Sequence, residues 1–395
     1  MKILIVHNYY KLPGGEDTVV RNEKRMLESH GHRVILYTRD NKELDNMSRI
    51  KKLLLPFCSV FNIRTFFDVR RILVKEKPDV IHVHNTLALI SPAVYYAGFL
   101  AGVPVVQTVH NFRLLCPGAS FFRNGHVCEE CVSKGLMCSV KHKCYRNSRL
   151  QSFASAFTLM IHRALGTYKK LNYICLTPFN KEKLLKLKGV DEDKVFIKPH
   201  FTESISADKT GYQNEKPYYV YVGRLEKIKG TDLLLKAWQD LGDEGPDLYL
   251  FGSGDMDERC RKYAEKNNLK NVFFKGHIDH AVLMEICSHA RALIFPSVCY
   301  EGFGMTIIEA YSLGVPVIAG DFGNGGSLVK EGRTGFKYKY DSPKALADTV
   351  RKAEGLSGES RNVLSTLAYK EYRDHYSEEA NYKMLLEIYK SVNKK

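Results

Sequence analysis

Short apolar runs alternate with amphipathic stretches in both halves of this chain, and that alternation constrains the fold more than any other feature. Buried strands are predicted at residues 2–7, 33–38, 80–83, 218–222, 248–251, 271–275 and 292–295. Amphipathic helices are predicted between them, for example at residues 18–30 and from Thr231. Strands that alternate with helices favour an α/β fold with doubly wound parallel sheets, which bind ligands beyond the carboxyl ends of their strands.

The length and a repeated turn indicate two domains. The 395 residues, 44% of them apolar, suffice for two cores. Gly102-Val-Pro-Val-Val and Gly314-Val-Pro-Val-Ile place the same helix-to-strand turn in each half. A Lys/Asp/Glu-rich connection at residues 189–199 and 202–217 is expected to separate the halves. We expect domains at 1–198 and 199–376, and a last helix at 377–395 that needs an apolar surface to pack on.

The stretch at residues 295–319 carries two carboxylates around a glycine-rich turn. Glu301 precedes Gly302 and Gly304, and Glu309 lies in the helical pattern that follows. A helix beginning near Gly304 would present its first amides to a phosphate. Those amides belong to Met305, Thr306 and Ile307. Phosphate binding between two carboxylates fits a nucleotide sugar; the alternative is an ordinary turn with two solvated glutamates.

A second motif follows the first strand of this half. Gly223-Arg224 and Lys229 leave the same loop, where two cations could hold a diphosphate without a metal ion. The loops that carry Gly252 and His277 could enclose a nucleobase or ribose. The alternative is that these isolated basic residues are ordinary surface side chains without a ligand.

In the first half, polar residues again follow the predicted strands. The loop after the first strand is Pro13-Gly14-Gly15-Glu16. Its paired glycines, Gly14 and Gly15, would let the backbone come close to a ligand. His84 and His110 lie at or beyond later strand ends, and His110 heads a loop that continues with Asn111. A histidine there could donate to a sugar hydroxyl or to a developing charge. The alternative for the two glycines is a simple turn.

Five cysteines gather in residues 116–146, around a hairpin with an Asn124-Gly125 turn. Cys128 and Cys131 form a Cys-x-x-Cys step that could offer two thiolates to one structural zinc ion, with Cys138 and Cys144 as further ligands. Cys116 or a nearby histidine could replace one of them. The alternative is a set of reduced loop cysteines.

The formal charge of +15 is concentrated in the first half of the chain. Residues 1–200 contain 32 Lys/Arg and 16 Asp/Glu, whereas the remaining 195 contain 27 and 28. Such a surface could attract nucleic acid, an anionic membrane or a phosphorylated acceptor. Residues 49–77 interleave eight basic side chains with Leu, Phe, Ile and Val, which is typical of a helix on a headgroup surface. The alternative is a core-facing helix with a basic solvent side.

Membrane insertion and export are not expected. The uncharged stretch at residues 87–109 is long enough for a membrane helix, but Pro92, Gly98, Gly102 and Pro104 interrupt it. A short helix at residues 93–101 and a buried strand at 105–109 account for it better. The first residues show no secretory signal, so we expect a cytoplasmic protein.

Taken together, Gly14-Gly15-Glu16, His110, Gly223-Arg224 with Lys229, the Glu301 and Glu309 pair and the Gly314-Val-Pro-Val-Ile strand resemble the retaining GT-B glycosyltransferases of glycosyltransferase family 4. The resemblance covers nearly the whole chain. It implies two Rossmann-like domains facing across a cleft, with the donor bound mainly to the second domain, the acceptor mainly to the first, and a C-terminal helix that crosses back. It also implies transfer without a metal ion or other cofactor.

The resemblance assigns a role to each motif. Arg224 and Lys229 would hold the donor diphosphate, Glu309 the ribose hydroxyls, and Glu301 the donor sugar. Gly15 would approach the phosphate, and His110 the sugar ring and reaction centre. The nucleoside diphosphate would depart and the acceptor would attack from the same face, so that the anomeric configuration is retained. Gly14, Gly223, Gly252, His277, Gly304, Met305, Thr306 and Ile307 complete the expected donor site, and Glu16, His84 and Asn111 an acceptor site.

The chain departs from the family pattern in two places. Ser327 stands where many relatives have an acidic residue, and the cysteine-rich segment resembles members associated with bacterial surface-polysaccharide assembly. With the basic first half, the latter favours a lipid-pyrophosphate-linked saccharide acceptor, a UDP-sugar donor, and a peripheral position at the inner face of the cell membrane. The alternatives are a GT-B sugar-nucleotide epimerase and, from another class, a basic nucleic-acid-binding protein.

Overall fold

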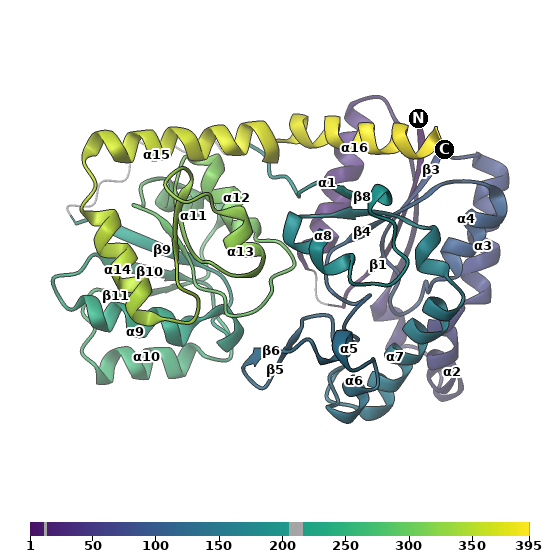
Figure 1. The fold of residues 1–395 in the computed structure, drawn as a ribbon, viewed down its shortest axis with the longest axis horizontal. Coiled ribbons are helices and arrows are strands. Elements are labelled where there is room, and N and C mark those ends of the chain that lie inside the picture. The colour runs from purple at the N-terminus through teal and green to yellow at the C-terminus, as the bar shows by residue number, and fades with distance from the viewer. Residues whose placement is uncertain (12–13, 205–215, 395) are drawn as a thin grey trace. The chain divides into compact units, whose positions relative to one another are not determined.

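The computed structural model describes residues 1–11, 14–204 and 216–394. Pro13, the middle of the charged connection (residues 205–215), and the side chains of Arg49, Lys51 and Leu53 lie outside the described residues. The chain divides into two compact units, which are described separately (Figure 1). The first unit comprises Met1–Phe121, Cys128–His200 and Asn381–Lys395, and the second comprises Phe122–Val127 and Phe201–Ala380.

The first unit is built on a parallel six-stranded sheet with the strand order β2-β1-β3-β4-β7-β8. Its strands are β1 (Lys2–Tyr9), β2 (Arg33–Asp40), β3 (Val80–Asn85), β4 (Val105–Val109), β7 (Asn172–Cys175) and β8 (Val195–Ile197). Strands β3 and β4 are buried along their whole length, as expected for the interior of a doubly wound sheet. The order reverses between β1 and β3, so the ends of these two strands border the crevice where such sheets bind ligands.

The helices predicted near residues 18–30 and 93–101 are present in the first unit, but residues 49–77 form two helices in place of the one expected, because Asn62 caps the start of the second. The helices of this unit are α1 (Gly15–Ser29), α2 (Arg49–Val60), α3 (Ile63–Glu76), α4 (Ala93–Ala101), α5 (Glu130–Ser133), α6 (Cys138–Lys141), α7 (Arg149–Ala164) and α8 (Pro178–Leu184). The uncharged stretch forms α4 and β4, which confirms the prediction of a short helix followed by a buried strand. No helix in the described ranges is long and apolar enough to cross a membrane.

The C-terminal helix α16 (Glu378–Asn393) contributes its residues from Asn381 onward to the first unit (Figure 1). Ser377 accepts a hydrogen bond from the amide of Ala380 at its start. Leu385, Ile388 and Tyr389 are buried, and the Tyr389 hydroxyl lies 2.7 Å from Nδ1 of His82 on β3. The helix therefore has the apolar packing surface that its sequence requires.

The prediction that residues 189–199 are only a connection was wrong. This segment contains β8, which pairs in parallel with β7 through Tyr173 and Val195. A strand of three residues is too short to be recognised in a segment with so many charged residues. A partner strand supplies the missing hydrogen bonds, a tertiary effect that composition does not reveal.

The second unit repeats the architecture with the strand order β11-β10-β9-β12-β13-β14. Its strands are β9 (Tyr218–Val222), β10 (Asp247–Phe251), β11 (Val272–Gly276), β12 (Leu293–Phe295), β13 (Val317–Gly320) and β14 (Gly335–Tyr338). Its helices are α9 (Thr231–Leu241), α10 (Asp257–Lys266), α11 (His280–Ser288), α12 (Met305–Ser312), α13 (Gly323–Leu328), α14 (Pro343–Glu354) and α15 (Gly358–Glu371). Two parallel doubly wound sheets confirm the predicted fold class. A two-stranded hairpin, β5 (Phe122–Arg123) and β6 (His126–Val127), confirms the predicted Asn-Gly turn.

Trp238 anchors the core of the second unit. It is fully buried on α9, and its indole N–H donates to the carbonyl of Pro246 at 2.9 Å. Its ring meets Tyr219 edge-on. Because it is the one tryptophan in the sequence, its fluorescence reports on this unit alone.

The second sheet reverses its order between β9 and β12, and the loops after these strands touch at Gly230. A Cβ on Gly230 would lie 1.9 Å from the carbonyl oxygen of Pro296. Gly230 also has a φ of 76°, which favours glycine. Close approach of the two loops therefore depends on this residue.

We predict that Gly230→Ala destabilises the protein far more than Gly102→Ala. Both glycines have a left-handed backbone, with φ 76° and ψ 25° at Gly230 and φ 68° and ψ 17° at Gly102, but a Cβ on Gly102 meets nothing within 4 Å. The control should lose about 1–2 kcal/mol from its left-handed backbone, and Gly230→Ala about 1–3 kcal/mol more from the clash. Denaturant unfolding followed by circular dichroism measures both. Equal losses would show that the two loops do not need this contact.

Candidate functional site

In the second unit, the predicted donor residues gather where the sheet order reverses. Lys229, after β9, places its ammonium 2.8 and 2.9 Å from the two carboxylate oxygens of Glu301, after β12. Ser297 also donates to Glu301. The structure thus joins two motifs that lie 72 residues apart in the sequence. A cation and a carboxylate meet at the strand edge where such sheets bind ligands.

Arg224 occupies the same loop but has a different partner. Its guanidinium pairs with Glu226, and its side chain is 67% exposed. The Tyr221 hydroxyl donates to the carbonyl of Arg224 at 2.7 Å and fixes the start of the loop. The two cations predicted to bind a diphosphate are therefore each paired with a carboxylate, and a bound diphosphate would have to compete for them.

Helix α12 begins at Gly304, as predicted, but its first amides are not all available. Gly304 has a φ of 144°, a conformation that favours glycine. The Ile307 amide donates to the carbonyl of Gly304 at 3.0 Å. Met305 and Thr306 remain the first-turn amides that point beyond the helix end.

Glu309 lies on α12 beside a small cavity that Thr306, Cys287 and Val222 also line. Burial raises the pKa of its carboxyl. The carboxylate forms no hydrogen bond or ion pair within the described ranges. A half-buried carboxylate without a bonded partner can accept hydrogen bonds from ligand hydroxyls.

The glycines of the neighbouring loops allow close backbone contact. The Gly252 amide donates to the carbonyl of Gly276, and a Cβ on Gly252 would lie 2.1 Å from the carbonyl oxygen of Gly223. His277, next to this contact, is exposed between β11 and α11. The predicted residues Gly223, Gly252 and His277 thus lie at adjacent strand ends.

In the first unit, Glu16 is held at the start of α1. Its carboxylate accepts hydrogen bonds from the Tyr10 hydroxyl at 2.9 Å and from Asn111 Nδ2 at 3.0 Å. Burial raises the pKa of Glu16. The predicted acceptor residues Glu16 and Asn111 are therefore brought together. Gly15, beside them, has nothing within 4 Å of an added Cβ, so the fold leaves open space in front of it.

His84 and His110 form a chain of imidazoles. His84 Nδ1 lies 2.9 Å from His110 Nε2, and His110 Nδ1 lies 3.3 Å from Nε2 of His200. Both ring nitrogens of His110 are therefore engaged within the unit, and it is 7% exposed. A hydrogen bond from its ring to a sugar, as expected from the sequence, would replace one of these contacts.

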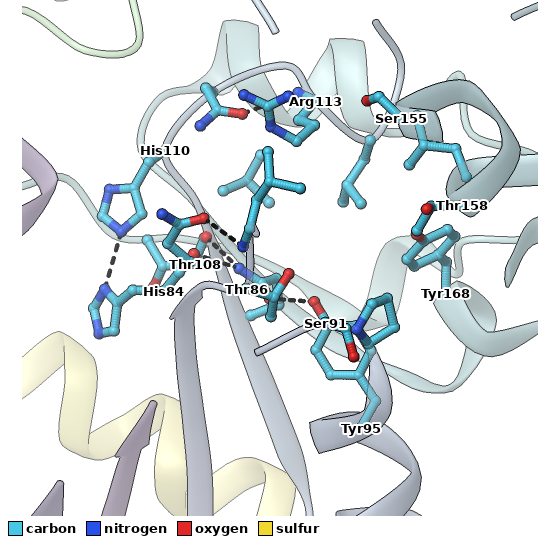
Figure 2. Close-up of a pocket in the computed structure, with 18 of the residues that line it drawn as sticks. His84, Thr86, Ser91, Tyr95, Thr108, His110, Arg113, Ser155, Thr158 and Tyr168 are labelled. Atoms are coloured by element: carbon cyan, nitrogen blue, oxygen red, sulfur yellow. Dashed lines mark hydrogen bonds between the residues drawn. The ribbon is translucent and has the colours of Figure 1, made fainter. Parts of the chain in front are cut away.

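Figure 2 shows His84 and His110 at the edge of a cavity of about 90 Å³. His84 and His110 lie on one side, and Arg113 and Ser155 border the cavity farther along, toward α7. Gln107 fixes the strand end by donating to the carbonyl of His84 at 2.9 Å. The cavity lies at the carboxyl ends of β3 and β4, where the fold predicts ligand contact.

The buried charges beneath the imidazoles were not predicted from the sequence. Glu23 of α1 pairs with Lys198, and both side chains are fully buried. Although burial raises it, Lys198 together with His84 and His82 holds the pKa of Glu23 well below its usual range. A signal was present, because Glu23 interrupts the buried stripe of Val19, Val20, Met26 and Leu27 on α1.

The cysteine segment has a different arrangement from the predicted zinc set. All ten cysteines are free thiols. Cys131 and the amides of Phe121, Gly118 and Ala119 hydrogen-bond to Cys116 and lower its pKa to about 6. In the described part of the chain, the one group with three ligand atoms within 4.8 Å of one another is Glu23, His82 and His84, not a cysteine set. Zinc binding by Cys128, Cys131, Cys138 and Cys144 stays a prediction.

Two family models match the sequence of this protein. A model described as Glycosyltransferase Family 4 matches residues 13–202, and one described as Glycosyl transferases group 1 matches residues 203–371. The chain belongs to the glycosyltransferases of the GT-B fold. The two models meet where the two units meet in the sequence.

Individual relatives of this GT-B glycosyltransferase match it along most of its length. It is 23% identical over 358 residues to an uncharacterized 41.2 kDa protein in the cps region of Klebsiella pneumoniae, covering 88% of each chain. It resembles a glycosyltransferase structure from Rickettsia africae with a TM-score of 0.71 at 18% identity, covering 99% and 98% of the chains. It also resembles HepE from Anabaena in complex with UDP, with a TM-score of 0.67 at 15% identity, covering 99% and 100%.

The imidazole chain predicts acid sensitivity of the first unit. Burial lowers the pKa of His7 to about 4 and of His200 to about 3, and it also lowers the pKa of His82 and His110 well below the usual value. Unfolded histidines bind protons near pH 6.5, so unfolding takes up protons below that pH. Each histidine should cost about 1.4 kcal/mol of stability per pH unit as the pH falls from 6.5 toward its lowered pKa.

Thermal unfolding between pH 7 and pH 4.5 measures this effect. Circular dichroism follows both units, whereas Trp238 fluorescence follows the second. We expect the circular dichroism transition to fall to lower temperature faster than the fluorescence transition. Parallel shifts of both signals would contradict the prediction.

Proposed function

We propose that this GT-B glycosyltransferase moves a sugar from a UDP-sugar to a hydroxyl of a saccharide acceptor with retention of configuration and without a metal ion. The observation that carries the proposal is the meeting of Lys229, Glu301 and the start of α12 at one strand edge, close in sequence to the unpartnered carboxylate of Glu309. Among the structural relatives, HepE has been solved with UDP and with UDP-glucose.

The roles follow from charge and position. Arg224, Lys229 and the amides of Met305 and Thr306 would stabilise the leaving diphosphate, since cations and helix amides favour negative charge. Glu309 would accept hydrogen bonds from the ribose hydroxyls, and Glu301, held by Lys229 and Ser297, would accept from the donor sugar. With leaving-group charge stabilised in this way, no side chain needs to act as a covalent nucleophile.

For the acceptor, we propose a lipid-pyrophosphate-linked saccharide that reaches Glu16, Asn111 and the cavity beside His84 and His110. The relative in a cps region supports a role in surface-polysaccharide assembly. Neither the epimerase alternative nor nucleic-acid binding has a specific observation in its favour. Product analysis distinguishes transfer from epimerisation, because only transfer requires a second substrate.

We also propose that the enzyme sits on an anionic membrane through an apolar surface on α2 and α7. Ser59 of α2 and Thr158 of α7 are 3.3 Å apart, so the two helices pack together. This α2/α7 surface consists of Ile50, Leu54 and Phe57 on α2 and of Leu150, Phe153, Phe157 and Met160 on α7, with exposed fractions of 40–73%. The spacing puts each set on one helix face. Apolar residues on a strongly basic half of the chain suit a headgroup surface.

We predict that Arg224→Ala weakens UDP binding. Loss of one charge-assisted hydrogen bond costs about 1.5–3 kcal/mol, which corresponds to about a tenfold to hundredfold higher Kd. Lys227→Ala is the matched control, because Lys227 lies on the same loop and is exposed like Arg224 but is not among the residues proposed to hold the diphosphate. Isothermal titration calorimetry in EDTA measures both. UDP binding that survives Arg224→Ala, or that requires a metal ion, would contradict the donor assignment.

We predict that Phe57→Asp abolishes most binding to phosphatidylglycerol vesicles. Phe57 is 71% exposed, and transfer of a phenylalanine into the membrane contributes about 1.5–3 kcal/mol, so partitioning should fall at least about tenfold. Val363→Asp, on α15 of the second unit and 52% exposed, should change little. Vesicle co-sedimentation at two salt concentrations measures the effect. Equal losses in both variants would show that the α2/α7 surface is not the contact.

A further inference from the structure

A second cavity of the first unit, of about 460 Å³, lies beside the α2/α7 surface and has no role in the site described so far. It combines a cationic side with an apolar side. The cationic lining is formed by Lys11, Lys52, Arg113 and Arg146, and the apolar lining includes Leu55, Pro56, Leu150 and Ala154. Such a combination suits a ligand that carries an anionic group on a hydrocarbon chain.

Two of the four cations of this lining lie against one aromatic ring. The guanidinium carbons of Arg113 and Arg146 lie 5.1 and 5.4 Å from the ring centre of Tyr145. Arg146 and Asn147 both have a φ of 51°, a left-handed conformation that non-glycine residues rarely adopt. The fold therefore fixes the backbone that presents Arg146 next to Arg113.

The charges of this cavity are not balanced by the residues that line it. Asp45 pairs with Lys11 and accepts, through its carbonyl, a hydrogen bond from Lys52 at 3.3 Å. Arg146 forms no ion pair with any residue in the described ranges. One carboxylate therefore faces four cations. A diphosphate diester, with two negative charges, would neutralise most of the excess.

The cavity adjoins the one beside the imidazole chain. Arg113, Ser155, Ser59 and Leu87 line both cavities, and Arg113 and Ser155 are visible at the border in Figure 2. On the other side, Leu150 belongs both to the cavity lining and to the α2/α7 surface, where it is 70% exposed. The cavity beside His84 and His110, the cation-lined cavity and the α2/α7 surface are thus adjacent, in that order.

We propose that this cavity binds the diphosphate of an isoprenoid-type lipid carrier, with Arg146, Lys52 and Arg113 on the phosphates and Leu150 and Leu55 against the first units of the lipid chain. The proposal rests on the proposed function, because it deepens the acceptor site of that enzyme. It also gives a reason for the position of the α2/α7 surface, since the lipid would continue from the cavity into the membrane.

Binding of farnesyl diphosphate, measured by isothermal titration calorimetry without vesicles, tests the proposal. We expect Arg146→Ala and Lys52→Ala each to raise the Kd at least about tenfold. Arg149→Ala is the matched control, because Arg149 lies three residues away and is exposed but does not line the cavity. It should change the Kd less than about twofold. UDP binding, which is proposed for the second unit, should be unchanged in all three variants, and circular dichroism, which follows both units, should show that the first unit is folded.

Three other outcomes would contradict the proposal or the proposed function. Unchanged farnesyl diphosphate binding in Arg146→Ala and Lys52→Ala, or an equal loss in Arg149→Ala, would overturn the diphosphate assignment. Pyrophosphate that binds as tightly as farnesyl diphosphate, with no effect of Leu150→Ala, would overturn the lipid part. A protein that binds farnesyl diphosphate as proposed but binds no UDP would instead contradict the proposed donor, which separates the two failures.

Discussion

The buried ion pair between Glu23 and Lys198 is the interaction on which the first unit most depends. It joins α1 to the chain just after β8, and His82 and His84 of β3 lie against the same carboxylate, at 3.6 and 3.4 Å. Removing one partner of such a pair leaves an uncompensated buried charge, at a cost of about 3–5 kcal/mol. Tyr389 of α16 bonds to His82, so the C-terminal helix is also connected to this network. The orientation of His84 and His110 follows from it.

The same sheet topology serves two kinds of chemistry. Both sheets reverse their strand order, between β1 and β3 in one unit and between β9 and β12 in the other. At the first reversal the chain places a buried carboxylate, an amide and imidazoles kept neutral by burial, which are groups that exchange hydrogen bonds with hydroxyls. At the second it places cations and helix amides, which suit phosphates. One architecture therefore carries two different sets of polar groups because only the loops differ.

Paired charges at the proposed donor site have a physical consequence. Lys229 and Arg224 are each held by a carboxylate, Glu301 and Glu226. The cations are thus positioned before a ligand arrives, and less side-chain entropy remains to be lost on binding. The exchange of a carboxylate for a diphosphate would release Glu301 for contact with the donor sugar, which connects binding of the nucleotide to placement of the sugar.

The sequence by itself determined the fold class, because period-2 and period-3.6 patterns are local and parallel sheets require continuous apolar strands. It also predicted that the loops after β9 and β12, and the residues Glu16, His84 and His110, follow the ends of strands. Only the tertiary structure decided their partners: Lys229 with Glu301, His110 with His200, and the interior position of Lys198. Those contacts join residues 72 to 175 positions apart, and pairing at such distances depends on which strands become neighbours. Strand β8 and the cation-lined cavity also emerged only there, since neighbouring strands and crossing helices create them and no local pattern encodes them.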